Sequence, residues 1–165
     1  MKPIKMSEYA DGNFETYPAA TYQVEVNDWE KCVAKTGTEQ IRVKATISNG
    51  EFSGKTITDH LALTDAAAWR LVWFIKSALD WDKPKMEQAG TLQVGSERFN
   101  KLLSLCKGRK MWWGVIVDPQ YGNNKVNEYV PEPNQNPVEV SELDDIPEFL
   151  KTKGQGNDEE FDNQF

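Results

Sequence analysis

Residues that commonly perform catalysis or bind metals are sparse in this sequence. His60 is the only histidine, and Cys32 and Cys106 are far apart, with no CxxC or Cys/His spacing. A zinc site needs several such ligands close together, so none is predicted. No nucleophile or orienting acid is spaced to act with His60. We therefore expect no catalytic site, no metal and no cofactor.

The segment 49–56, NGEFSGKT, is similar to a phosphate-binding loop at first sight. The pattern GxxxxGK[ST] places four residues between its glycines, whereas three separate Gly50 from Gly54. A phosphate-binding loop must also open a helix whose N-terminus faces the anion, but the residues after Thr56 alternate as in a strand. The segment is therefore interpreted as a turn.

Basic and aromatic side chains offer a different chemistry, which is contact with a phosphate backbone and stacking on bases. Such residues lie on predicted outward strand faces, in turns and in the stretch 98–125, which has six bases and one acid. The basic candidates are Lys31, Lys35, Arg42, Lys44, Lys55, Arg109, Lys110 and Lys125. The ring candidates are Trp29, His60, Trp112 and Tyr121.

Two of these rings have alternatives that the sequence leaves open. Trp112 and Trp113 are adjacent in a strand, so they point to opposite faces. Trp113 shares its parity with Val115 and is assigned inward, which leaves Trp112 outward, either free to stack on a base or covered by a helix. Tyr121 either belongs to a ligand-binding loop or serves an ordinary turn.

The charge of the chain is unevenly distributed. The formal net charge is −7, which by itself disfavours a nucleic-acid partner. Residues 139–165 contain nine acids and two bases, so this segment alone carries −7 and residues 1–138 are neutral overall. The net charge therefore does not exclude a basic surface on the body of the protein.

Three segments with alternating apolar residues, 22–33, 41–47 and 57–63, predict strands, because a period of two separates a core face from a solvent face. Glycine-containing turns separate them. The alternation slips at 27–29, which predicts a bulge or bend in the first strand.

The remaining elements follow from period and caps. A helix is predicted at 65–80, apolar almost all round, with Trp69 and Trp73 in the core. A loop at 81–94 and a helix at 96–108 precede strands at 109–118 and 125–130. Three strands, a helix and two strands is the order of an OB-fold. The predicted class is mainly β with helices (α+β), a five-stranded OB-like barrel with its helix between strands 3 and 4.

The domain boundaries follow from composition. Residues 1–20 are interpreted as an N-terminal arm, 21–130 as the OB-like domain, and 131–165 as a disordered linker and acidic C-terminal tail. Acids adjoin aromatic residues twice in the tail, and a terminal Phe offers a ring and a carboxylate to a partner protein. The residues expected to contact partners are Asp144, Asp145, Ile146, Pro147, Phe149, Phe161, Asp162 and Phe165. The alternative is a tail that only promotes solubility.

The tail resembles that of single-stranded-DNA-binding proteins, whose bacterial tip is DDDIPF, with LDDIPEF at 143–149 and FDNQF at the end. The body resembles a family of tailed-phage proteins from replication and recombination clusters, through the turns at 35–37 and 50–55, the apolar helix and the segment 126–131. This resemblance implies an OB-fold, non-catalytic coating of single-stranded DNA, and contact with replication or recombination proteins through the tail.

The leading hypothesis is a non-sequence-specific single-stranded-DNA-binding protein whose acidic tail recruits partners and competes with DNA. The alternative is a protein-interaction adaptor or homo-oligomeric component, favoured by the apolar helix 65–80. A nuclease is disfavoured, because no spacing links Asp28, Asp59 and Asp118. The absence of a signal-peptide pattern or membrane-length apolar run predicts a cytoplasmic protein with no membrane partner, in the host cytoplasm if phage-encoded.

Overall fold

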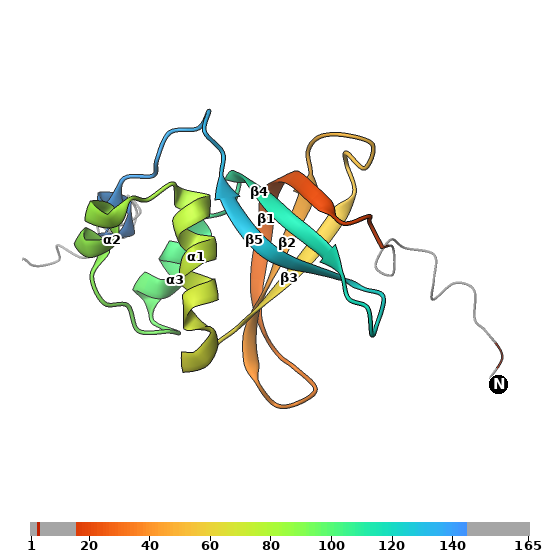
Figure 1. The fold of residues 1–165 in the computed structure, drawn as a ribbon. Coiled ribbons are helices and arrows are strands. Elements are labelled where there is room, and N and C mark those ends of the chain that lie inside the picture. The colour runs from red at the N-terminus through yellow and green to blue at the C-terminus, as the bar shows by residue number, and fades with distance from the viewer. Residues whose placement is uncertain (1–2, 4–15, 145–165) are drawn as a thin grey trace, which may run out of the picture.

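The structure is a computed structural model that describes Pro3 and residues 16–144. Its centre is a five-stranded antiparallel sheet with the order β3-β2-β1-β4-β5 (Figure 1). The strands are β1 (Ala20–Val33), β2 (Glu39–Ile47), β3 (Thr56–Ala62), β4 (Lys110–Val117) and β5 (Asn124–Pro131). The predicted α+β class, the five strands and the helical insertion between strands 3 and 4 are confirmed.

Strand β1 is long enough to pair with two partners. It pairs with β4 over residues 20–25 and with β2 over residues 24–33. The register with β2 shifts between Val26 and Asp28, at the predicted bulge. Since a bulge bends and twists its strand, the inward residues of both halves of the sheet, such as Ile41 and Trp113, contribute to one core.

The sheet is not closed into a barrel, and in that respect the prediction is wrong. Within residues 16–144, β3 pairs only with β2 and β5 only with β4. Side chains join these two edges instead. Arg70 donates from Nη2 to Asp59 Oδ1 of β3 (2.9 Å) and to the carbonyl oxygen of Val126 in β5 (2.5 Å), and the Tyr129 hydroxyl of β5 donates to Asp59 Oδ2. We call the gap between the edge strands β3 and β5 the seam. Asp59, Arg70 and Tyr129, which bridge it, are called the seam network.

Two helices begin where the sequence predicts. A 3-10 turn, η3 (Asp65–Ala67), leads into α1 (Ala68–Leu79), and the Thr64 side chain caps the turn by accepting from the Ala67 amide. Helix α3 (Glu97–Leu105) starts after Ser96, whose Oγ accepts from the Phe99 amide at 3.1 Å. Both caps satisfy backbone donors that a helix leaves free in its first turn.

The segment 81–94, predicted as a loop, contains a third helix, α2 (Lys83–Ala89). Pro84 lies in its first turn, where the missing N–H has no intrahelical partner to lose. The Asp82 side chain caps it by accepting from the Lys85 amide at 3.0 Å. Proline was therefore a helix-start signal here rather than a loop signal.

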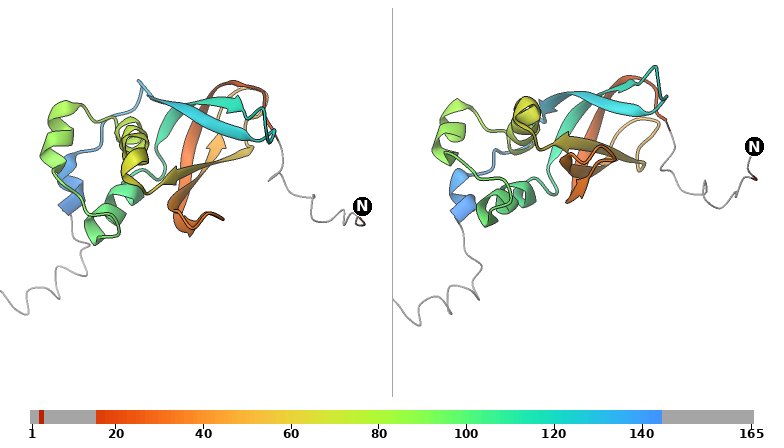
Figure 2. Two further views of the ribbon diagram at one scale, coloured as in Figure 1. Left: turned by 60° about the horizontal axis from the view of Figure 1, so that its bottom comes forward. Right: turned by 90° about the horizontal axis from the view of Figure 1, so that it is seen from below.

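The helices gather at one end of the sheet (Figures 1 and 2). Helix α1 packs mainly against β5 and also contacts β3 and β4, while α3 packs against α1 and β1. The inner side of α1 buries Leu71, Phe74, Ile75 and Ala78. This packing places one side of α1 directly over the seam.

Residues 132–144 form a strap from the end of β5 to the helices (Figure 1). Val138, Val140 and Leu143 are buried, and the short helix η4 (Val140–Asp144) packs against α2 and α3. The indole N–H of Trp81 donates to the Val138 carbonyl at 2.6 Å. The prediction that a disordered linker begins at 131 is therefore wrong for residues 131–144.

The end of the predicted arm is attached to both edge strands. Tyr17 is buried, and its backbone exchanges two hydrogen bonds, each 2.8 Å, with the Asn124 side chain at the start of β5. Its hydroxyl donates to the carbonyl of Thr56 in β3 at 3.0 Å. Tyr9 and Phe14, two further aromatic residues of the predicted arm, lie outside the described residues. In residues 16–144, no helix has the length and apolar character to cross a membrane.

Candidate nucleic-acid interface

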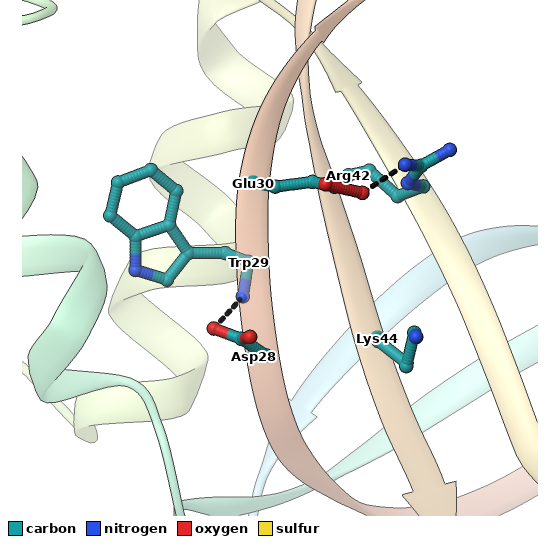
Figure 3. Close-up of a pocket in the computed structure, with 5 residues that line it drawn as sticks. All are labelled: Asp28, Trp29, Glu30, Arg42 and Lys44. Carbon is teal, nitrogen blue, oxygen red and sulfur yellow. Dashed lines mark hydrogen bonds and ion pairs between the residues drawn. The ribbon is translucent and has the colours of Figure 1, made fainter.

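The outer face of β1, β2 and β3 carries the two strand cations that the sequence singled out. Antiparallel register places Arg42 between Glu30 and His60, and Lys44 between Asp28 and Thr58. The residues around Arg42 and Lys44 form a depression of about 110 Å³ (Figure 3). We call the outward side chains of β2 and β3, namely Arg42, Lys44, Thr58 and His60, the β2–β3 face.

Acidic side chains partly balance the positive charge of this face. The Arg42 guanidinium donates to the Glu30 carboxylate, and this hydrogen bond raises the pKa of Arg42. Both side chains are exposed, at 43% and 56%, and exposed ion pairs stabilise by only about 0–1 kcal/mol. Lys44 forms no ion pair with any residue that the structure describes. Both cations can therefore bind a phosphate with little loss to the fold.

Trp29 is among the residues that line this depression, but its ring does not share the β2–β3 face. Its partner across the ladder is the buried Val43, and its ring lies on the opposite side of β1 from Lys44 (Figure 3). The indole N–H donates to Ser104 Oγ of α3 at 3.4 Å. Trp29 therefore packs between the sheet and α3, and a base bound near Arg42 would not stack on it.

The turns next to the face contribute further cations. Lys35 is exposed in the β1–β2 turn, and Lys55 is exposed between β2 and β3. Lys31, near the end of β1, forms an ion pair with Glu39 at 3.5 Å. These three lysines lie near the ends of β2, the strand that carries Arg42 and Lys44.

A cleft of about 340 Å³ lies at the seam, beside the β2–β3 face. It is lined by Thr58, Asp59, His60, Arg70, Asn123, Asn124, Lys125 and Val126. Its charged groups are already engaged, because Arg70 belongs to the seam network and Lys125 pairs with Asp118 at 2.7 Å. Burial lowers the pKa of His60, so its imidazole is neutral at neutral pH.

The loop between β4 and β5, which ends in this cleft, is held by Asp118. Its carboxylate accepts from the amides of Gln120 (2.7 Å) and Tyr121 (3.1 Å) as well as from Lys125. These donors, Lys125 foremost, lower the pKa of Asp118. The Tyr121 side chain is 74% exposed, so the loop presents a ring to solvent while its backbone is fixed.

The remaining candidates are used by the strap. Arg109 donates from Nε to the Ala78 carbonyl (2.9 Å) and from Nη2 to the Asn136 carbonyl (2.7 Å). The backbone of Lys110 exchanges two hydrogen bonds with the Gln135 side chain. Trp112 points outward, as predicted, but its indole N–H donates to Glu132 at 3.0 Å. Thus Arg109 and Trp112 fix the strap, and only the ammonium of Lys110 remains for another ligand.

Sequence reasoning missed the positions of two neighbouring residues of α1. Trp69 was assigned to the core, yet it is 63% exposed and stacks on Trp73 with ring centroids 6.0 Å apart. The next residue, Arg70, lies in the cleft. The available signal was Arg70 itself, which with Lys76 is one of two cations in a largely apolar helix.

A separate apolar groove lies between α1, α2 and α3. Its volume is about 250 Å³ and its walls include Leu71, Ile75, Met86 and Phe99. Val72, at its rim, is exposed. The predicted surplus of apolar residues on α1 is therefore real, and part of it faces solvent.

Most of the tail residues expected to contact partner proteins lie beyond residue 144, where the described part of the chain ends. Asp144 is described, and its carboxylate accepts from Arg98 Nε at 3.0 Å. The other expected partner-binding residues lie outside the described residues: Asp145, Ile146, Pro147, Phe149, Phe161, Asp162 and Phe165. In the described part of the chain, no three His, Cys, Asp or Glu side chains are grouped to hold a metal ion.

Comparison of the chain with protein-family models and with curated proteins finds no match.

Proposed function

We propose that the protein binds single-stranded DNA without sequence specificity, along the β2–β3 face and the seam. The observation that carries the proposal is the placement of Arg42 and Lys44 on one outward face, with exposed Tyr121 and Trp69 on elements beside it. In OB-folds, this strand pair and the β1–β2 and β4–β5 loops bind oligonucleotides. Here the long first strand pairs with both β2 and β4, and helices separate β3 from β4, which supports an open OB-like topology.

The presence of cations for the phosphates and of separate aromatic rings for the bases suits single-stranded DNA. Lys35, Arg42 and Lys44 supply cations along the phosphate backbone, and each neutralised phosphate releases counterions. Stacking on an aromatic ring contributes about 1–3 kcal/mol per base without regard to sequence. The resemblance to the tailed-phage family leads to the same proposal, with a role in replication or recombination, the acidic tail contacting partner proteins, and a cytoplasmic location.

Titration with oligo-dT, followed by tryptophan fluorescence at two salt concentrations, tests this proposal. Full-length protein and a chain ending at Asp144 should both bind at low salt, and more weakly at high salt. Ending at Asp144 keeps the buried Val140 and Leu143. Failure of both forms to bind at low salt would refute DNA binding.

The apolar groove favours a second candidate function, an adaptor or homo-oligomer that docks proteins through α1. Val72 and Trp69 are both exposed on α1, and Val72 lines the groove. Under this alternative, Val72→Asp would abolish self-association or partner capture without changing oligo-dT affinity. Sedimentation of the unaltered protein and of Val72→Asp at high concentration separates the two functions.

A further inference from the structure

The cleft at the seam differs from the rest of the candidate interface in the kind of group it leaves unused. Within residues 16–144, the side chains of Thr58, His60 and Asn123 have no hydrogen-bond partner. Thr58 and His60 project from β3, and Asn123 approaches from the opposite wall, where the β4–β5 loop meets β5. Three polar side chains without hydrogen-bond partners therefore line the same cleft from two walls.

The cations of the cleft, in contrast, are occupied. Arg70 donates to the His60 carbonyl, to Asp59 and to the Val126 carbonyl, at 2.5 to 2.9 Å. Lys125 is paired with Asp118. A phosphate entering the cleft would have to displace these contacts, several of which lie in a buried network whose disruption is costly. The cleft therefore suits a neutral, polar ligand.

The unused groups match such a ligand. A hydroxyl, a carboxamide and a neutral imidazole each offer both a donor and an acceptor, and burial keeps the pKa of His60 low enough for the neutral form. The edges of nucleobases carry donors and acceptors in alternation. The volume of about 340 Å³ lies at the lower end of the roughly 300–1,000 Å³ typical of small-ligand sites.

We propose that the seam cleft holds one unstacked nucleobase of a bound single strand, hydrogen-bonded at its edge by Thr58, His60 and Asn123. This inference rests on the proposed function and adds a base-dependent contact to it. The phosphates on either side remain on the β2–β3 face, where Arg42 is the neighbour of His60 and Lys44 the neighbour of Thr58 across the ladder. The open seam therefore has a role that a closed barrel would exclude, because β3–β5 pairing would fill the cleft.

The test compares two fluorescein-labelled oligomers of equal length, oligo-dT and a fully abasic strand, by fluorescence anisotropy at low salt. Thr58→Val and Asn123→Ala remove hydrogen-bonding groups from the cleft at little cost in volume. Each variant should bind oligo-dT about three- to tenfold more weakly, the effect of one lost hydrogen bond. Each should bind the abasic strand as the unaltered protein does, which also shows that the variant is folded.

The matched controls are Thr21→Val in β1 and Asn127→Ala in β5, which change the same groups on exposed strand positions outside the cleft. They should leave both affinities unchanged. Equal losses on oligo-dT and on the abasic strand, no loss on either, or equal losses in the controls would overturn the base-binding cleft while DNA binding stands. Failure of the unaltered protein to bind either strand would refute the proposed function and this inference together.

Discussion

Replacing Arg70 by methionine should weaken the fold more than its position near the surface suggests. Methionine keeps most of the side-chain length but removes every donor that Arg70 contributes to the seam network. The Arg70 side chain is 23% exposed and the Asp59 side chain 6%. Removing one partner of a buried ion pair destabilises by about 3–5 kcal/mol. Because the seam opens into a cleft, where solvent screens the pair, we expect a smaller loss of about 2–3 kcal/mol.

The loss should depend on pH in a defined direction. Burial raises the pKa of Asp59, and Arg70 is the main group that opposes this effect. Without Arg70 the pKa rises further, so the folded state holds its proton to higher pH than the unfolded state. Stability is then lost as pH rises through that pKa. The free energy of unfolding lost in Arg70→Met should therefore be larger at pH 8 than at pH 5.

Urea denaturation followed by tryptophan fluorescence measures both quantities. The matched control is Arg42→Met, because Arg42 also pairs with a carboxylate but on the exposed face. This control should lose at most about 1 kcal/mol. A loss below about 1 kcal/mol in Arg70→Met at both pH values would show that the seam network does not hold β3 to β5.

Three further results are expected. Trp69→Ala should weaken oligo-dT binding, measured by anisotropy, by about 1–3 kcal/mol. Val72→Ala, at another exposed position of α1, should not weaken it, and equal effects would show that Trp69 is not part of the interface. Glu132→Gln should lower the free energy of unfolding at pH 7 more than in acid, because the Asn134 amide and other donors lower the pKa of Glu132 and that stabilisation is lost as pH falls; a loss independent of pH would contradict this. Removing residues 145–165, which carry six acids and two bases, should tighten DNA binding at low salt about threefold or more; unchanged affinity would exclude competition by the tail.

Much of the fold follows from local patterns in the sequence. Period-two alternation located the first three strands, and the slip at 27–29 located the bulge. The closed barrel was wrong because closure depends on whether β3 and β5 meet, which no local pattern reports. Here Arg70 and Tyr129 take the place of the missing ladder.

The candidate site was predictable only where the alternation of a strand determines which side chains point outward. Arg42, Lys44 and His60 share a face because the register of β2 and β3 aligns them. The hydrogen bond from Arg109 to the strap was not predicted, because its carbonyl partner, Asn136, lies far along the chain in a segment whose composition predicts disorder. The exposure of Trp69 was missed for a similar reason, since the side of α1 that faces solvent depends on where α3 and β5 pack.

The central claim is that a single strand lies on the β2–β3 face, and the salt dependence of oligo-dT affinity tests it most directly. Each phosphate contact adds about 0.7 to the slope of log affinity against log salt for single strands. The double variant Arg42→Gln/Lys44→Gln should therefore have a slope smaller by about 1.4, while Lys76→Gln/Lys83→Gln, on the exposed helical end, should keep the original slope. An unchanged slope in the first variant, or an equal reduction in both, would contradict the account.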